Sequence, residues 1–207
     1  MREIVLNRRA FVTLAASSVV LAGCTTLETE DESGEASVDQ IILVRGLANI
    51  FSTGLDRLGD RLEDQGLKPT VVGLGSPSSR ARTIAAKTRN NSRRGAVVLV
   101  GHSYGADEAI RIANSLDDEG VKVDLLLTFD PTISGPVSKN VRHAINYHTT
   151  SAGMWGPIKA GDGFNGRLNN VNVGEESDDN DRINHFNVEK AETLHERAVR
   201  EIKRVVA

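Results

Sequence analysis

The 207-residue sequence has the length of one folded domain, and 39% of its residues are hydrophobic, which is enough to bury a core. Its 25 basic and 28 acidic side chains give a formal net charge of -3 and form no basic tract. Binding to a phosphate backbone needs clustered Lys and Arg, so we expect no nucleic-acid partner.

The first 23 residues have the pattern of an export leader. An Arg8-Arg9 pair precedes an apolar stretch over residues 10–22, which is too short for a membrane-spanning helix. The stretch ends in Leu21-Ala22-Gly23-Cys24, which resembles the bacterial lipoprotein signal. The resemblance implies cleavage before Cys24 and lipidation of its thiol. The alternative, an ordinary buried cysteine, leaves the small residues before it unexplained.

This resemblance implies an exported protein that a lipid anchors to the bacterial cell envelope. Thr25, rather than Asp, follows the cysteine, which favours the periplasmic face of the outer membrane. The Arg8-Arg9 pair also resembles a twin-arginine signal, and general secretory export stays open. Residues 24–39 hold six acidic side chains among Thr, Ser and Gly, so we expect a flexible acidic tether there. The predicted globular domain spans residues 40–207.

From residue 40 onward, short apolar runs alternate with helical patterns. The runs are rich in β-branched residues or leucine and cover residues 41–44, 70–72, 96–100, 123–129, 144–148 and 168–173. Apolar residues recur at helical spacing in residues 55–62, 81–85, 106–116 and 194–205. Nearly continuous apolar strands need cover on both faces, and parallel neighbours need crossovers. The pattern predicts an α/β fold, a doubly wound, mostly parallel sheet of about six strands with helices on both faces.

One apolar run leads directly into a serine flanked by glycines. Residues 96–100 are followed by Gly101-His102-Ser103-Tyr104-Gly105, and a helical pattern begins immediately afterwards. Strand, sharp turn and helix are the context that a nucleophile elbow needs. In so tight a turn only glycine fits on either side, and the strained backbone pushes the serine hydroxyl clear of the sheet. Ser103 is therefore the predicted nucleophile.

A serine hydroxyl needs a base that takes its proton and a carboxylate that orients the base. Asp130 ends an apolar run, which places it at the same edge of the sheet as Ser103. His185 lies on a loop before the last helix and is the predicted base, because a loop histidine can reach the serine. His148, at the end of an earlier run, is the alternative base. The side chain of His102 is expected to point away from Ser103.

Residues 40–207 resemble the α/β-hydrolase superfamily, at the minimal, lidless end of its size range. The nucleophile motif carries this resemblance, and Leu127-Thr128-Phe129-Asp130-Pro131 resembles the strand-Asp-Pro segment of pancreatic-type lipases. The resemblance implies a catalytic triad of Ser103, Asp130 and His185. It also implies an oxyanion hole formed by the backbone N–H groups of Leu47 and Tyr104. The first strand departs from lipases, because Arg45 stands where they often place a histidine.

Arg45 and a glycine-rich segment are further candidates for substrate binding. Arg45 either binds a carboxylate or phosphate of the substrate or pairs with a structural acid. Residues 150–167 contain five glycines and no helical period, and long loops of this kind are usually functional or mobile. We predict that Met154 and Trp155, within this segment, line the substrate groove. The alternative is that Trp155 packs into the core.

The sequence predicts no metal site and no cofactor. Asp178, Asp179 and Asp181 suggest a calcium loop, but a solvated acidic loop is the better interpretation. No glycine-rich loop precedes a lysine at the spacing of a phosphate-binding loop. The sequence therefore predicts an esterase-like or lipase-like serine hydrolase that cleaves a small acyl ester or thioester through an acyl-enzyme. The alternative hypothesis is an envelope lipoprotein that uses the same fold for binding.

Overall fold

The computed structural model describes residues 38–47, 53–91, 93–133, 135–150, 154–178 and 181–206. The chain divides into two units, Met1–Gly34 and Glu35–Ala207, and everything described belongs to the second unit. The predicted leader, the lipidation site Cys24 and most of the predicted tether lie outside the described residues. Within the part of the chain that is described, no helix is both long and apolar enough to cross a lipid bilayer.

Six strands form one sheet in the order β2-β1-β3-β4-β5-β6, and all neighbours are parallel. The strands are β1 (Val38–Val44), β2 (Pro69–Val72), β3 (Arg94–His102), β4 (Leu125–Phe129), β5 (His143–His148) and β6 (Arg167–Asn172). The chain runs outward from β1 to β2, then returns to β3 and continues in the other direction. The strand order therefore reverses between β1 and β3. Ligands of open α/β sheets bind at the carboxyl ends of the strands beside such a reversal.

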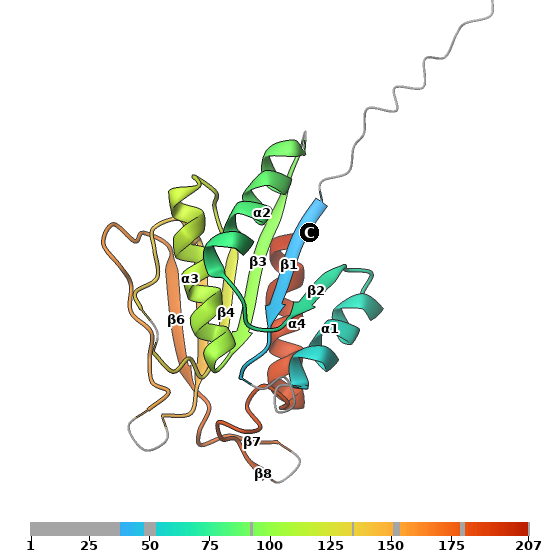
Figure 1. Ribbon diagram of the computed structural model, residues 1–207. Helices are drawn as coiled ribbons and strands as arrows, with labels where there is room; N and C mark the ends of the chain where they lie inside the picture. The colour runs from blue at the N-terminus through green and yellow to red at the C-terminus, as the bar shows by residue number, and fades with distance from the viewer. Residues whose placement is uncertain are drawn as a thin grey trace, which may run out of the picture. The chain divides into compact units, whose positions relative to one another are not determined.

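Two pairs of helices cover the two faces of the sheet (Figure 1). They are α1 (Gly54–Asp64) with α4 (Glu192–Val206), and α2 (Pro77–Asn90) with α3 (Tyr104–Asp118). Side chains of β3 alternate between the two cores. Val98 and Val100 pack in the core of α1 and α4, while Val97 and Leu99 pack in that of α2 and α3. The predicted doubly wound sheet with helices on both faces is confirmed.

The spacing of leucines explains why α1 covers the sheet. Leu55, Leu58 and Leu62 lie on one stripe of the helix, and all three are fully buried. Removing a leucine side chain from water contributes about 1.5–3 kcal/mol, so this stripe alone is a large share of the attraction between α1 and the sheet.

The observed elements differ from the predicted ones mainly at their ends. Strand β1 begins at Val38, inside the predicted tether, because the Asp39 carboxylate accepts a hydrogen bond from Ala96 N at 2.7 Å. A short hairpin that the sequence did not predict joins β7 (Ser177–Asp178) to β8 (Asp181–Arg182). Asp178 accepts hydrogen bonds from the first backbone N–H groups of α4, at 2.8 Å from Glu192 N. This carboxylate therefore caps a helix.

Candidate active site

Ser103 occupies a strained turn between β3 and α3. Its backbone angles are φ 56° and ψ −126°, a conformation that residues with a side chain seldom adopt. The turn is fastened to the neighbouring strand, because Ser103 N donates a hydrogen bond to Phe129 O at 2.9 Å. These features are those of the predicted nucleophile elbow.

The two glycines beside Ser103 are required by close backbone approaches. A Cβ atom on Gly101 would lie 2.3 Å from Gly105 O, and one on Gly105 would lie 2.2 Å from Val44 O. Neither position has room for any side chain. The second approach also brings the elbow against the end of β1, where the predicted oxyanion segment begins. Leu47 and Tyr104 thus lie on two adjoining segments of backbone.

Asp130 follows β4 and is completely buried. Its φ is 45°, which turns the chain sharply after the strand. Thr149 supplies two hydrogen bonds to the carboxylate, from its backbone N to Oδ1 at 2.7 Å and from its hydroxyl to Oδ2 at 2.8 Å. The carboxylate is therefore fixed in place by the end of β5.

His185 joins the two other predicted residues. Its Nε2 lies 3.2 Å from Ser103 Oγ, and its Nδ1 lies 3.3 Å from Asp130 Oδ2. Because the carboxylate accepts the Nδ1–H, the lone pair of Nε2 is left to accept the serine proton. The structure thus brings together Ser103, Asp130 and His185. The alternative base, His148, forms a hydrogen bond with Thr150 Oγ1 at 2.6 Å instead.

His102 makes a contact that the sequence did not predict. Its Nε2 donates a hydrogen bond to the backbone O of His185 at 3.1 Å, and the two rings lie 5.1 Å apart. Burial, followed by the nearby His185, lowers the pKa of His102 to about 4, so the ring is neutral at neutral pH. His102 therefore links the nucleophile strand to the loop that carries the base. No periodicity in the sequence signals such a link.

Trp155 lies on the predicted base. The indole and the His185 imidazole are stacked, with ring centroids 4.0 Å apart and an interplanar angle of 11°. Phe186 meets the same imidazole edge-on at 5.6 Å. Met154, the residue before Trp155 in the chain, is 54% exposed. That Met154 and Trp155 line a substrate groove remains a prediction.

Arg45 is paired with an acid on α1. Its Nε donates to both carboxylate oxygens of Asp56, at 3.0 and 3.2 Å, and its Nη2 donates to Asp56 Oδ1. This contact favours the structural alternative for Arg45 over substrate binding.

Glu189, on the loop that carries His185, is a buried carboxylate at the amino end of α1. Neither of its carboxylate oxygens has a hydrogen-bond partner of good geometry among the described residues. Burial raises the pKa of Glu189 to about 7, although Lys190 opposes the shift. The packing is tight, because a Cβ on Gly54 would lie 2.1 Å from Glu189 Oε2.

Most of the exposed large apolar side chains belong to segments that follow the strands of the sheet. Seven such residues are strongly exposed in the described part of the chain. Five of them follow β1 to β5, one after each strand, and a sixth, Phe186, follows the short strand β8 and contacts His185. We call these six the apolar rim: Leu47, Leu74, Tyr104, Ile133, Met154 and Phe186. The opposite edge of the sheet has one such residue, Val38.

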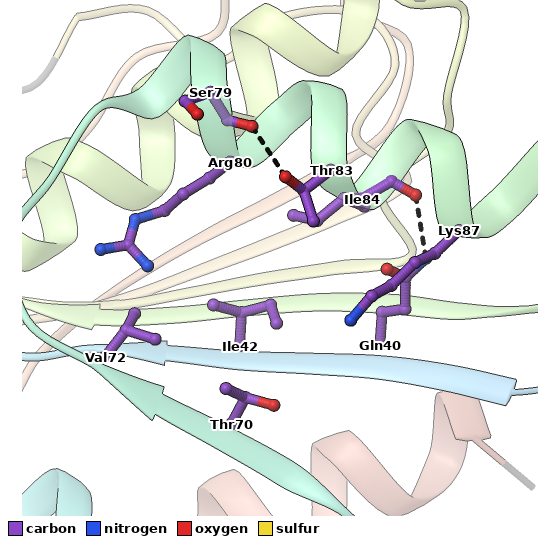
Figure 2. A pocket seen from close by; sticks show the side chains of 9 residues that line it. All are labelled: Gln40, Ile42, Thr70, Val72, Ser79, Arg80, Thr83, Ile84 and Lys87. Carbon is purple, nitrogen blue, oxygen red and sulfur yellow. Dashed lines mark hydrogen bonds between the residues drawn. The ribbon is translucent and has the colours of Figure 1, made fainter.

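A cavity of about 250 Å³ lies away from these residues, between α2 and strands β1 and β2. Figure 2 shows Arg80 extending from α2 toward Val72 and Lys87 extending from the same helix toward Gln40. Arg80 is engaged by Glu108, at 2.8 Å. None of the three triad candidates lines this cavity. Among the described residues, no group of three or more His, Cys, Asp or Glu could hold a metal ion.

Solved structures with a similar fold include several hydrolases. A protein from Xanthomonas campestris pv. campestris assigned to the alpha/beta hydrolase superfamily is 20% identical, with 80% of this chain and 98% of that chain covered and a TM-score of 0.41. The NocB thioesterase domain from the nocardicin cluster is 15% identical, with 83% and 95% covered and a TM-score of 0.49.

A protein from Pectobacterium atrosepticum assigned as a YdeN-like hydrolase is 12% identical, with 82% and 94% covered and a TM-score of 0.47. At these identities the likeness concerns the fold alone. No protein-family model matches the sequence, and no curated protein matches it.

Proposed function

We propose that the protein is a serine hydrolase that cleaves an acyl ester or thioester through a covalent acyl-enzyme. One observation carries the proposal. Ser103 Oγ, the His185 imidazole and the Asp130 carboxylate form a continuous hydrogen-bonded chain, with the serine on a strained turn. A strained conformation at a nucleophile is a common sign of function.

In the proposed mechanism, His185 Nε2 takes the proton of Ser103 as Oγ bonds to the acyl carbon. Asp130 holds the imidazole in the tautomer that accepts this proton and stabilises the imidazolium that forms. The tetrahedral intermediate then collapses, the bond to the alcohol or thiol breaks, and His185 returns the proton to that leaving group. His185 then takes a proton from water as the water oxygen bonds to the acyl carbon. The bond from that carbon to Ser103 Oγ breaks, His185 returns the proton to Oγ, and the acid is released.

The negative oxygen of the tetrahedral intermediate needs donors that are already in place. The backbone N–H groups of Leu47 and Tyr104 are the proposed donors, since the close approach of Gly105 to Val44 O joins their two segments. Backbone donors do not depend on the side chain, so the arginine before Gly46 leaves this role intact. Loss of one such donor typically reduces kcat about 10²- to 10³-fold.

The apolar rim supports a substrate with an apolar acyl group. When an apolar ligand covers exposed apolar side chains, their surface is removed from water, and this lowers the free energy of the complex. Five of the six rim residues come after strands β1 to β5, whose carboxyl ends lie at the edge that holds Ser103, and the sixth, Phe186, contacts His185. Met154 of the rim and the adjoining Trp155 are proposed to line the acyl groove.

Labelling with a fluorophosphonate probe tests the proposal directly, because only an activated serine reacts rapidly. The wild-type protein should be labelled, and Ser103→Ala should not. A wild-type protein that stays unlabelled and hydrolyses no p-nitrophenyl ester would instead favour a binding lipoprotein. His185→Ala should abolish turnover, whereas abolition by His148→Ala alone would show that the base is misassigned.

We also propose that lipidated Cys24 anchors the mature chain to the envelope membrane, at the periplasmic face of the outer membrane. The support is the sequence pattern of the leader. Cys24→Ser should release the protein into the soluble fraction. Retention of that variant on membranes after a carbonate wash would contradict the anchor.

A further inference from the structure

The indole of Trp155 covers one face of the imidazole of His185. The centroid separation of 4.0 Å and the angle of 11° describe close, parallel stacking. The other ring contacts of His185 are more distant and inclined, with His102 tilted by 38° and Phe186 by 77°. Trp155 is therefore the only one of the three rings that lies flat on the imidazole.

The two hydrogen bonds of His185 need this support. At 3.2 and 3.3 Å they lie at or beyond the long end of the usual range, which is about 2.7–3.2 Å for N–H donors. Bonds of this length restrain the tilt of the ring only weakly. The orientation of the imidazole therefore depends on the surface packed against its face.

Trp155 is held there by a backbone conformation that bulky residues disfavour. Its φ of 54° costs on the order of 1–2 kcal/mol. Hydrogen bonds to two successive carbonyl groups hold this segment in place, because Thr150 N donates to Trp155 O at 3.1 Å and Asn146 Nδ2 donates to Gly156 O at 3.1 Å. Asn146 lies in β5 and is fully buried. The sheet therefore fixes where the indole sits.

We propose that Trp155 is a positioning residue for His185, a role that rests on the proposed function. The face contact keeps Nε2 directed at Ser103 Oγ and Nδ1 directed at Asp130. When the Ser103 proton moves to Nε2 and Oγ bonds to the acyl carbon, the indole face lies against the new imidazolium and favours its charge. A residue that only lined the groove would contact the acyl chain and would affect substrate binding rather than the orientation of His185.

The stacking can be observed in solution without any catalysis. Trp155 is the only tryptophan of the chain, so intrinsic fluorescence reports on this residue alone. His185→Gln should change the intensity or wavelength of the emission. The matched control His143→Gln, at the start of β5, should leave the emission unchanged. Identical spectra for the wild type and His185→Gln would show that the stack is absent and overturn the inference.

The kinetic test uses a series of substitutions at position 155 with a short p-nitrophenyl ester. Trp155→Ala and Trp155→Leu should lower kcat about 10- to 100-fold, the usual effect of a misplaced reacting group, with KM changed less than about twofold. Trp155→Phe, which restores a flat ring, should recover most of kcat. The control Val38→Ala, at an exposed position on the amino edge of the sheet, should keep the wild-type kcat.

Each other outcome contradicts the positioning role. A rise in KM that grows with acyl length, at constant kcat, would show that Trp155 only lines the groove and does not orient His185. A lower Tm with kcat unchanged would make it a structural residue. Wild-type protein that neither reacts with the fluorophosphonate nor turns over ester would refute the proposed function itself, a result distinct from an active enzyme that tolerates Trp155→Ala.

Discussion

The two edges of the sheet are built on different principles. At the amino edge, polar groups satisfy one another, as where Asp124 accepts hydrogen bonds from Arg94 Nη2 at 2.7 Å and Val97 N at 2.9 Å. At the carboxyl edge, four residues other than glycine have a positive φ, and no others do in the described ranges. They are Ser103, Asp130, Thr150 and Trp155. The apolar rim lies at this same edge.

The comparison shows where conformational strain has been concentrated. A residue held in a sparsely populated conformation costs about 1–3 kcal/mol and persists only where its surroundings impose it. Here the packed helix and sheet layers and the hydrogen-bonded amino edge stabilise the fold, and they hold the strained residues in their conformations. The strain falls on the proposed nucleophile, on the proposed acid and on the segment whose Trp155 packs against the proposed base. The strained positions therefore coincide with the proposed active site.

The largest expected effect is a loss of activity, which should follow from substitutions at the carboxyl edge and not from a substitution at the amino edge. Ser103→Ala, His185→Ala and Asp130→Asn should each lower kcat for a p-nitrophenyl ester on the order of 10⁴-fold, and a double variant should be no worse than the worst single one. Asp124→Asn, at the amino edge, should lower Tm and leave kcat in place. Effects that multiply in the double variants would contradict a triad that acts as a unit.

The next effect concerns the tight turn at the carboxyl edge. Gly105→Ala forces a Cβ to 2.2 Å from Val44 O, so it should destabilise the fold by roughly 3–5 kcal/mol, at the upper end for single substitutions. The control Gly135→Ala has open space around its Cβ and should change the free energy of unfolding by less than about 0.5 kcal/mol. Urea denaturation measures both, and equal values for the two variants would mean that the elbow is not closely packed.

The substitution Glu189→Gln tests how one buried carboxyl group makes the stability of the fold depend on pH. The pKa of Glu189 in the folded chain is about 7, above the usual 4.5, so its contribution to stability is present below pH 4.5 and is lost as pH rises through 7. Facing Lys190 and Arg57 reduce this loss without removing it. The neutral variant should therefore gain stability over the wild type between pH 5 and pH 8, by an amount on the order of 3 kcal/mol. A gain that is the same at both pH values would show that Glu189 does not titrate in this range.

The smallest effect comes from relieving strain at one position. Thr150 is β-branched and has a φ of 46°, whereas Asn tolerates this conformation. Thr150→Asn should raise the urea midpoint by an amount equivalent to about 0.5–1 kcal/mol. The same substitution in an ordinary strand, Thr70→Asn, should lower it. A drop for Thr150→Asn would mean that the bond of Thr150 to His148 outweighs the strain.

The sequence predicted those parts of the molecule that leave a periodic or local pattern. Apolar runs gave all six strands of the sheet to within two or three residues, and the serine between two glycines gave the elbow. The hydrogen bond of His102 to the His185 loop and the stack of Trp155 on His185 were not predicted. Both join segments far apart in the chain, and their geometry depends on loops whose course no periodicity sets. The hairpin before α4 was missed for the same reason, since its strands are only two residues long.

The four strained positions also have an evolutionary consequence. Substitution by Gly or Asn relaxes a positive φ, so random mutation without selection for catalysis drifts these positions toward those two residues. A related chain with Gly or Asn at the positions of Thr150 and Trp155 would be easier to fold and poorer at holding its histidine. Among related chains, such replacements would mark those that have kept the fold and lost the proposed hydrolase activity.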